Sequence, residues 1–172
     1  CYIMNYKLNI SYDGTNFCGW QTQRKDRTVQ NDIENALRKI FTDQNIKLIG
    51  SGRTDSGVHA INQVANFWID TNIHEEKIRL AINSYLKNDI YINECKIVEK
   101  DFHARYSATK REYYYNISNV FSPFNRRYSW LIRKKIKKNK LKECSHLIKG
   151  IHNFSNFCKT SSLKENNHCE IF

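Results

Sequence analysis

Apolar and polar residues follow two different periods along the first hundred residues of the chain, and these periods predict six elements of secondary structure. Four segments alternate apolar and polar residues as half-buried β-strands do, namely 6–10, 46–51, 60–69 and 90–97. Apolar residues recur at helical spacing over 28–41, where Thr28 can cap the first turn, and over 75–87. The expected order of elements is therefore β-α-β-β-α-β.

With an antiparallel sheet, that order is the ferredoxin-like plan of the α+β class. Both helices would then cover one face of the sheet and leave the other face free for a partner. Beyond residue 105 the periods are weaker, although 111–119 alternates like the first strand of a second unit and 134–149 has an apolar stripe at helical spacing. We expect one complete domain, residues 1–105, and an incomplete second α+β domain, residues 106–172.

The composition is typical of a water-soluble globular protein. Hydrophobic residues make up 40% of the chain, and the mean hydropathy is −0.69. No apolar run approaches the roughly 18 residues that a membrane span needs, and no signal peptide is recognisable. The six cysteines show no Cys-x-x-Cys pair and no zinc-finger spacing, so we expect reduced thiols in the cytoplasm, no membrane association and no bound metal.

The net charge of +11 arises almost wholly from the second part of the chain. Residues 1–105 are nearly neutral, whereas residues 106–172 carry 14 lysines and arginines against 4 acidic residues. A basic half is typical of a surface that binds a polyanion such as nucleic acid. The chain is also rich in Lys, Asn and Ile throughout, and this compositional bias offers a second explanation of the charge.

Residues 51–60 read Ser-Gly-Arg-Thr-Asp-Ser-Gly-Val-His-Ala and join two of the predicted strands. The glycines allow a tight turn, and Asp55 would be held at the edge of the sheet beside the guanidinium of Arg53. A bare Arg-x-Asp sequence is most often a solvated turn, so only the whole string is informative. His59 leads into the next strand, and we interpret it as structural.

This string resembles the catalytic signature of the tRNA pseudouridine synthase A family, which reads Gly-Arg-Thr-Asp-(Ala/Ser/Lys)-Gly-Val-His. Four further stretches are similar to blocks of that family and follow in the family's order: 12–21, 28–34, 83–90 and 102–108. Tyr113 falls in the family's Tyr-x-Tyr, whereas Lys87 stands where proline is usual. Beyond residue 117 the likeness is loose, and residues 150–157 resemble a helix of the family.

The resemblance implies an enzyme, an isomerase that converts uridine to pseudouridine at positions 38–40 of the tRNA anticodon stem-loop. It further implies a homodimer with tRNA as its partner, no cofactor, and a second domain similar to the first. The reaction breaks the N1–C1′ bond and joins C5 to C1′, which needs no redox step and no metal. A related synthase with another RNA target, or a basic RNA-binding module without catalysis, remains an alternative.

The resemblance assigns Asp55 as the catalytic residue, either as a nucleophile on the sugar or as a base. Either role needs an ionised carboxylate that is shielded from water. Arg53 would help to extrude the uracil and fill the space it leaves, and Tyr113 would stack on the extruded base. Further candidate RNA contacts are Asp13, Gln21, His103, Arg105, Arg126, Arg127, Lys134 and Lys135.

The family's basic partner for the aspartate lies in a carboxy-terminal part that residues 1–172 do not match. We therefore expect the natural protein to continue beyond Phe172, and residues 1–172 alone to bind RNA poorly and to be inactive. Three residues precede the only methionine, Met4, so either Met4 is the natural start or the sequence is a fragment.

If the basic residues bind phosphates, binding of tRNA will weaken steeply as salt is added, because each bound phosphate releases counterions. Joint replacement of Lys134, Lys135, Lys137 and Lys138 by Gln is expected to reduce the slope of log Kd against log salt by about 0.7–0.9 for each phosphate that the variant no longer neutralises. Filter binding at several salt concentrations measures this slope. An unchanged slope would mean that the lysines reflect composition and not RNA binding.

Overall fold

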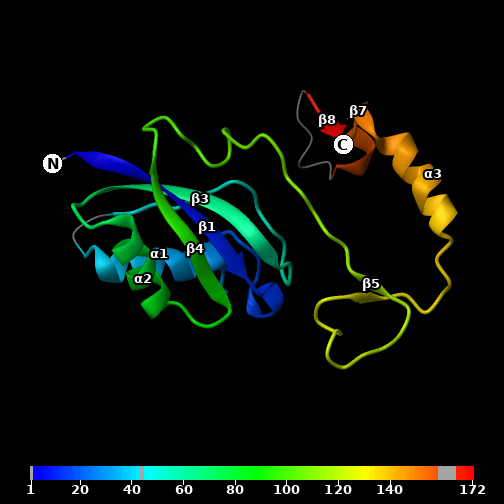
Figure 1. The fold of residues 1–172 in the computed structure, drawn as a ribbon, viewed down its shortest axis with the longest axis horizontal. Helices are drawn as coiled ribbons and strands as arrows, with labels where there is room; N and C mark the ends of the chain where they lie inside the picture. Colours follow the sequence, from blue (N-terminus) through cyan, green and yellow to red (C-terminus); the bar gives the residue numbers. More distant parts are fainter. Residues whose placement is uncertain (1, 43–44, 159–165) are drawn as a thin grey trace. The chain divides into compact units, whose positions relative to one another are not determined.

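A four-stranded antiparallel sheet with two helices forms the first part of the chain, as the computed structural model in Figure 1 shows. The structure describes residues 2–42, 45–158 and 166–172. Two compact units can be separated, Cys1–Tyr113 and Tyr114–Phe172. This division falls later than residue 105, since Arg111 donates a hydrogen bond back to the carbonyl of Ser51 in the first unit.

The first unit follows the predicted β-α-β-β-α-β order. Its elements are β1 (Ile3–Tyr12), the 3-10 turn η1 (Gly14–Asn16), α1 (Val29–Ile40), β2 (Ile49–Gly50), β3 (Ala60–Asp70), α2 (Glu75–Tyr85) and β4 (Ile90–Val98). The sheet order is β2-β3-β1-β4 and every neighbouring pair is antiparallel, which confirms the ferredoxin-like prediction. The strand predicted over 46–51 is shorter than expected, because only the two residues of β2 pair with β3.

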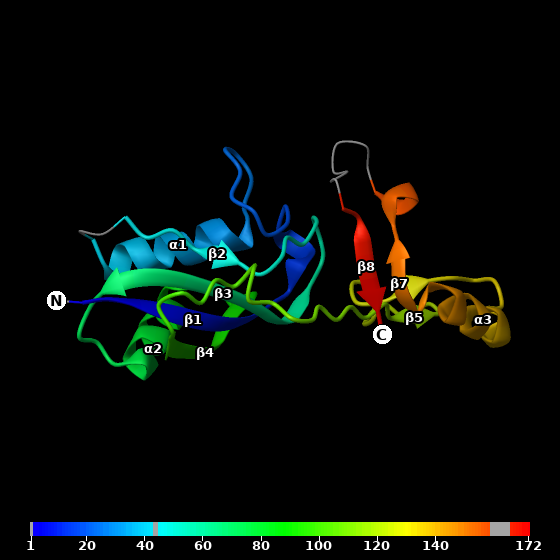
Figure 2. The same cartoon turned by 90° about the horizontal axis from the view of Figure 1, so that it is seen from above.

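The two helices cover one face of the sheet and lie side by side (Figures 1 and 2), with the apolar core between the layers. Tyr6, Leu8 and Ile10 alternate along β1 and are fully buried in this core. The Tyr6 ring stacks on Phe67 of β3, with the ring centroids 5.6 Å apart. Burial of each such side chain contributes about 1.5–3 kcal/mol, and a slip of one residue would expose the whole set.

Helix α1 begins at the residue that the sequence marks as its cap, because the Thr28 hydroxyl accepts from the backbone N–H of Asn31 at 3.4 Å. Helix α2 has a cap that the sequence pattern did not indicate. There the ring nitrogen Nδ1 of His74 accepts from the N–H of Glu76 at 3.2 Å. No helix in the described part of the chain is long and apolar enough to cross a membrane.

The sheet face opposite the helices is partly covered, contrary to the prediction that it is free. Two asparagines of this face, Asn5 on β1 and Asn66 on β3, are buried and hydrogen-bonded to each other at 2.9 Å. Asn5 Nδ2 also donates to the carbonyls of Glu99 and Phe102, at 3.0 and 2.8 Å. Asn66 Oδ1 accepts from the N–H of Ala104 at 2.9 Å. The chain after β4 is thereby fastened across this face.

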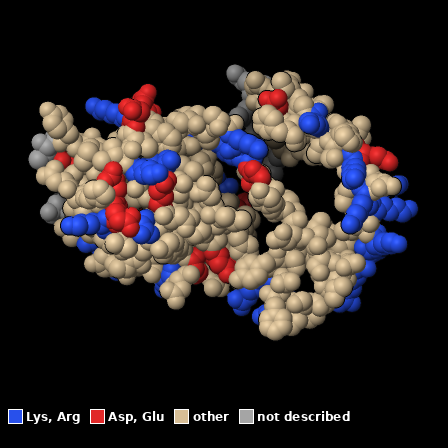
Figure 3. Space-filling model, in the orientation of Figure 1, with Lys and Arg blue, Asp and Glu red and all other residues tan. Residues whose placement is uncertain are grey.

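The second unit contains small separate elements. These are β5 (Ile117–Ser118), β6 (Trp130–Leu131), α3 (Lys138–Ile148), β7 (Gly150–Asn153), the 3-10 turn η2 (Ser155–Phe157) and β8 (His168–Ile171). β5 pairs with β6 in parallel, and β7 pairs with β8 antiparallel. None of the residues described in this unit is buried. On the viewed face, Lys and Arg side chains gather around α3, which contains Lys138, Lys140 and Lys142 (Figure 3).

Two predictions for this region were wrong and one was confirmed. Helix α3 lies within the predicted segment 134–149. The strand predicted over 111–119 is reduced to β5, because Ile117 and Ser118 are the residues of this range whose pairing with another described strand forms a ladder. The helix expected over 150–157 is instead β7 followed by η2, since the backbone of Gly150–Asn153 pairs with β8.

The buried asparagine pair predicts a specific loss of stability. Asn66→Ala is expected to lower the free energy of unfolding by about 1–3 kcal/mol, because it leaves the Ala104 N–H and Oδ1 of Asn5 without their partner. Asn62→Ala, on the exposed part of the same strand, is the matched control and should change it by less than about 0.5 kcal/mol. Denaturant unfolding of both variants measures the difference, and equal losses would contradict the role of the pair.

Candidate active site

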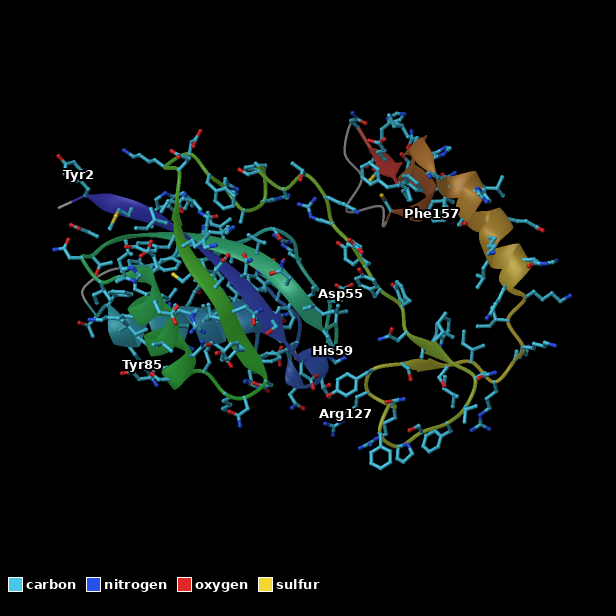
Figure 4. All side chains as sticks on the ribbon, viewed as in Figure 1. Tyr2, Asp55, His59, Tyr85, Arg127 and Phe157 are labelled. Atoms are coloured by element: carbon cyan, nitrogen blue, oxygen red, sulfur yellow. The ribbon has the colours of Figure 1, made fainter. Side chains whose placement is uncertain are left out.

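The loop 51–59 leads from β2 into β3 and carries Asp55 near its tip. Figure 4 places Asp55 and His59 on this loop at one end of the sheet. Asp55 and Arg53 are both exposed, so the predicted shielding of the carboxylate from water is not found. Within the described residues, the Asp55 carboxylate has no hydrogen bond or ion pair of its own.

The backbone on both sides of Asp55 is held by the segment that follows β1. Before it, the carbonyl of Thr54 accepts from the N–H of Trp20 at 3.0 Å. After it, the N–H of Gly57 donates to the carbonyl of Phe17 at 3.2 Å. These bonds fix the position of the Asp55 backbone while the side chain remains accessible to a substrate.

The two segments approach so closely that glycine is required on the β1 side. A Cβ atom on Gly14 would overlap the carbonyl group of Val58. A Cβ atom on Gly19 would lie 2.6 Å from the carbonyl oxygen of Thr54, and Gly19 has a φ of 85° that disfavours other residues. The Tyr12 hydroxyl, 2.9 Å from Oγ1 of Thr54, adds a side-chain contact to the same interface.

His59 closes the base of the loop against the same segment. Its Nδ1 accepts from the N–H of Gly14 at 3.1 Å and lies 3.0 Å from Oδ1 of Asp13. These two contacts tie His59 to this segment. The carboxylate of Asp13 also accepts from the N–H of Thr15 at 3.0 Å. Asp13 therefore has a structural role in the protein, and its contact with RNA stays a prediction.

Arg27 anchors the far end of this clamping segment. Its guanidinium binds both carboxylate oxygens of Asp89, at 2.6 and 2.7 Å, and Nε donates to Asp32 at 2.9 Å. The hydrogen bonds from Arg27 hold the pKa of Asp89 below its ordinary value. The guanidinium also lies over the Phe17 ring, 4.1 Å from its centroid. Phe17, whose carbonyl accepts from Gly57, therefore packs against an arginine that is itself held by ion pairs.

A second set of contacts holds the entry to the loop. The N–H of Ser51 donates to the carbonyl of Val64 at 2.8 Å, and the Ser51 hydroxyl donates to the side-chain oxygen of Gln63 at 2.8 Å. The Gln63 amide in turn donates to the carbonyl of Gly52 at 2.8 Å. Arg111 Nη2 donates to the Ser51 carbonyl at 2.7 Å. The sequence pattern gave no indication of Arg27 or Arg111, because their partners Asp89 and Ser51 are 62 and 60 positions away along the chain.

The other predicted contact residues of the first unit lie on exposed segments. Gln21 is exposed in the loop before α1. His103 and Arg105 form a turn in which Nδ1 of His103 accepts from the N–H of Arg105 at 3.2 Å. The His103 ring packs on Tyr106, with centroids 4.4 Å apart. Tyr113, in the extended segment that follows, has 69% of its surface exposed and is therefore free to stack on a base.

The remaining candidates belong to the second unit, where all are exposed: Arg126, Arg127, Lys134 and Lys135. Arg126 donates to the carbonyl of Pro123. In the described parts of the chain, no group of three or more His, Cys, Asp or Glu side chains could hold a metal ion. Asp55 is the one carboxylate of the loop 51–59, and Arg53 is two positions before it in the sequence.

These features define a class of protein, namely an α+β fold that presents a single carboxylate on a backbone-clamped loop at the end of its sheet. The family model described as tRNA pseudouridine synthase matches residues 9–107. The chain is 42% identical to tRNA pseudouridine synthase A of Dictyoglomus thermophilum over 174 residues, covering 99% of this chain and 70% of the relative. It is 44% identical to the Brachyspira hyodysenteriae protein of the same name, covering 91% and 64%.

A third relative, tRNA pseudouridine synthase A 1 of Protochlamydia amoebophila, is 42% identical over 88% of this chain and 60% of its own length. The chain belongs to the tRNA pseudouridine synthase family, which confirms the resemblance drawn from its motifs. It spans 60 to 70% of the length of these three curated relatives.

The close approach at Gly14 predicts that this position controls the geometry of the Asp55 loop. Gly14→Ala is expected to cost roughly 1–3 kcal/mol of stability, because the Val58 carbonyl is backbone and must move. Asn16→Ala, at an exposed position of the same 3-10 turn, is the matched control. Thermal unfolding and amide hydrogen exchange over residues 51–59 measure both effects. Equal behaviour of the two variants would contradict the clamp.

Proposed function

We propose that the protein isomerises uridine to pseudouridine in tRNA, at positions 38–40 of the anticodon stem-loop. Two findings support the activity: membership of the tRNA pseudouridine synthase family, and relatives that are named as enzymes of this type. The observation that carries the proposal for this chain is Asp55, an accessible carboxylate on a loop whose backbone is fixed on both sides.

In the proposed reaction Asp55 acts as an ionised carboxylate on the ribose of the target uridine. The N1–C1′ bond breaks, the uracil turns, C5 bonds to C1′, the proton on C5 is lost and N1 gains a proton, so that the product is an isomer of uridine. Asp55 serves either by attacking C1′ or by removing a proton from the sugar, and both roles use the same oxygen atoms. Because Asp55 is exposed in the protein, we propose that the bound tRNA itself covers the carboxylate and excludes water.

The target uridine must leave its stem before Asp55 can reach the sugar. Extrusion of a paired base costs a few kcal/mol. In this proposal Tyr113 stacks on the extruded uracil and returns about 1–3 kcal/mol, and Arg53 fills the space left in the stem. The exposed ring of Tyr113 and the exposed guanidinium of Arg53 are consistent with these roles.

The basic residues of the second unit would bind the tRNA backbone. The four candidates among them are exposed: Arg126, Arg127, Lys134 and Lys135. The net charge of the chain, +11, also favours contact with phosphates. Such contacts position the RNA on the protein but do not read its base sequence. Recognition of the anticodon arm by its shape suits such contacts. We further propose a homodimer in the cytoplasm, with one tRNA bound by both subunits.

The exposed tyrosines at 113, 114 and 115 are also compatible with a module that binds RNA without modifying it. The rigid presentation of Asp55 favours the enzyme, because a carboxylate repels phosphate and has no use in a simple RNA-binding surface. A synthase with a different RNA target would share every feature of the loop. Mapping pseudouridine in cellular RNA after deletion of the gene distinguishes the three functions.

Replacement of the carboxylate tests the proposed chemistry. Asp55→Asn and Asp55→Ala are each expected to lower pseudouridine formation by roughly 10²–10⁴-fold or more, with little change in tRNA affinity. Ser56→Ala is the matched control, because it changes only the neighbouring side chain, a hydroxyl that donates to the Phe17 carbonyl at 3.2 Å. Tritium release from labelled uridine in tRNA measures turnover by the intact protein. Turnover of either Asp55 variant within tenfold of wild type would refute the assignment.

A further inference from the structure

We propose that Arg111 is a positioning residue that sets the distance between the Asp55 loop and the segment that carries Tyr113. Its Nη2 donates two hydrogen bonds, to the carbonyl of Ser51 at 2.7 Å and to the carbonyl of Arg105 at 3.3 Å. The first carbonyl is at the entry to the loop, and the second belongs to the turn that precedes Tyr113. One guanidinium therefore joins two segments that are more than 50 residues apart in the sequence.

The side chain of Arg111 reaches Ser51 by crossing the backbone of Gly52. A Cβ atom at position 52 would lie 3.5 Å from Nε of Arg111 and 3.9 Å from its Cδ. The glycine thus leaves a surface on which the arginine stem can lie flat. The two hydrogen bonds hold the guanidinium at the carbonyl oxygens, although Arg111 as a residue is exposed.

Both acceptors of the Arg111 bridge are themselves fixed to the sheet. Ser51 is bonded to Val64 of β3 through its N–H at 2.8 Å. The turn that contains Arg105 is fastened by the N–H of Ala104, which donates to the buried side chain of Asn66 on the same strand at 2.9 Å. Because both acceptor segments are bonded to β3, the two hydrogen bonds hold the backbone of Arg111 in a fixed position relative to this strand.

Tyr113 lies two residues beyond Arg111, in a segment that belongs to no strand. The Arg111 bridge holds the backbone two residues before Tyr113 to Ser51, at the entry to the Asp55 loop. The role of the bridge in catalysis rests on the proposed function. The distance between Tyr113 and Asp55 matters because Tyr113 stacks on the extruded base while Asp55 must reach the sugar of the same nucleotide. A misplacement of about 1 Å between such groups can cost about 10²-fold in rate.

Arginine suits this role better than lysine. Two carbonyl oxygens need a donor group with several N–H bonds in fixed directions. The planar guanidinium has such N–H bonds and stands at the end of a long side chain. An ammonium at position 111 would keep the charge but would approach the two oxygens less well. This difference separates the proposed bridge from a simple contact with an RNA phosphate, which lysine can also make.

Three variants of the intact protein test the proposal: Arg111→Ala, Arg111→Lys and the adjacent control Lys110→Ala. Arg111→Ala is expected to lower the single-turnover rate constant at saturating enzyme by about 10- to 100-fold, with the Kd for tRNA within about threefold of wild type. Arg111→Lys should remain well below the wild-type rate, and Lys110→Ala should match it. In the free protein, amide exchange over residues 51–59 should be faster in Arg111→Ala and unchanged in Lys110→Ala.

Two results would overturn the proposal. A wild-type rate at saturation together with weaker tRNA binding and a smaller salt slope would make Arg111 a phosphate contact. Unchanged exchange over residues 51–59 in Arg111→Ala would mean that the bridge does not hold the loop. If the wild-type protein forms no pseudouridine, the proposed function fails, and the exchange measurement still decides whether Arg111 fixes the loop.

Discussion

The first unit depends on the backbone pairing between the Asp55 loop and the segment that follows β1. Trp20 and Phe17 bind the backbone on either side of Asp55, and the glycines of that segment allow the contact. Strands and helices bring the two segments to the same end of the sheet, but these few hydrogen bonds decide where the carboxylate lies. A flexible loop would have to lose conformational entropy each time it bound a substrate, whereas this loop has already lost it on folding.

The sheet, both helices and the loop with Asp55 could be predicted because their signals are local. Alternation identified β1 and β3, helical spacing identified α1 and α2, and the string around Asp55 indicated the candidate site. The clamp could not be predicted, because its main bonds join backbone atoms that every residue possesses. Gly14 and Gly19 were the available signal, since a pair of glycines in a polar loop often marks a close approach.

Errors in the prediction have physical causes of the same kind. Alternation over 111–119 shows which residues could form a strand, but a strand also needs a neighbour, and only Ile117 and Ser118 have one. The open face of the sheet was predicted from the order of the strands and helices alone. That order gives no information on the buried pair Asn5 and Asn66, or on the segment after β4 that the pair holds across this face. The expected shielding of Asp55 rested on the chemistry of the reaction and not on any residue that could cover it.

The anchor at Arg27 has a consequence for the order of events as the chain folds. Arg27 and Asp89 are 62 positions apart, and the backbone N–H of Asp13 also donates to the carbonyl of Asp89 at 2.9 Å. Contacts of such long range form late, because closure of a long loop must precede them. A growing chain can therefore hold the complete sequence around Asp55 and still lack the clamp. The clamping segment gains its anchor at Asp89 only when the chain leading into the last strand of the sheet has been made and docked.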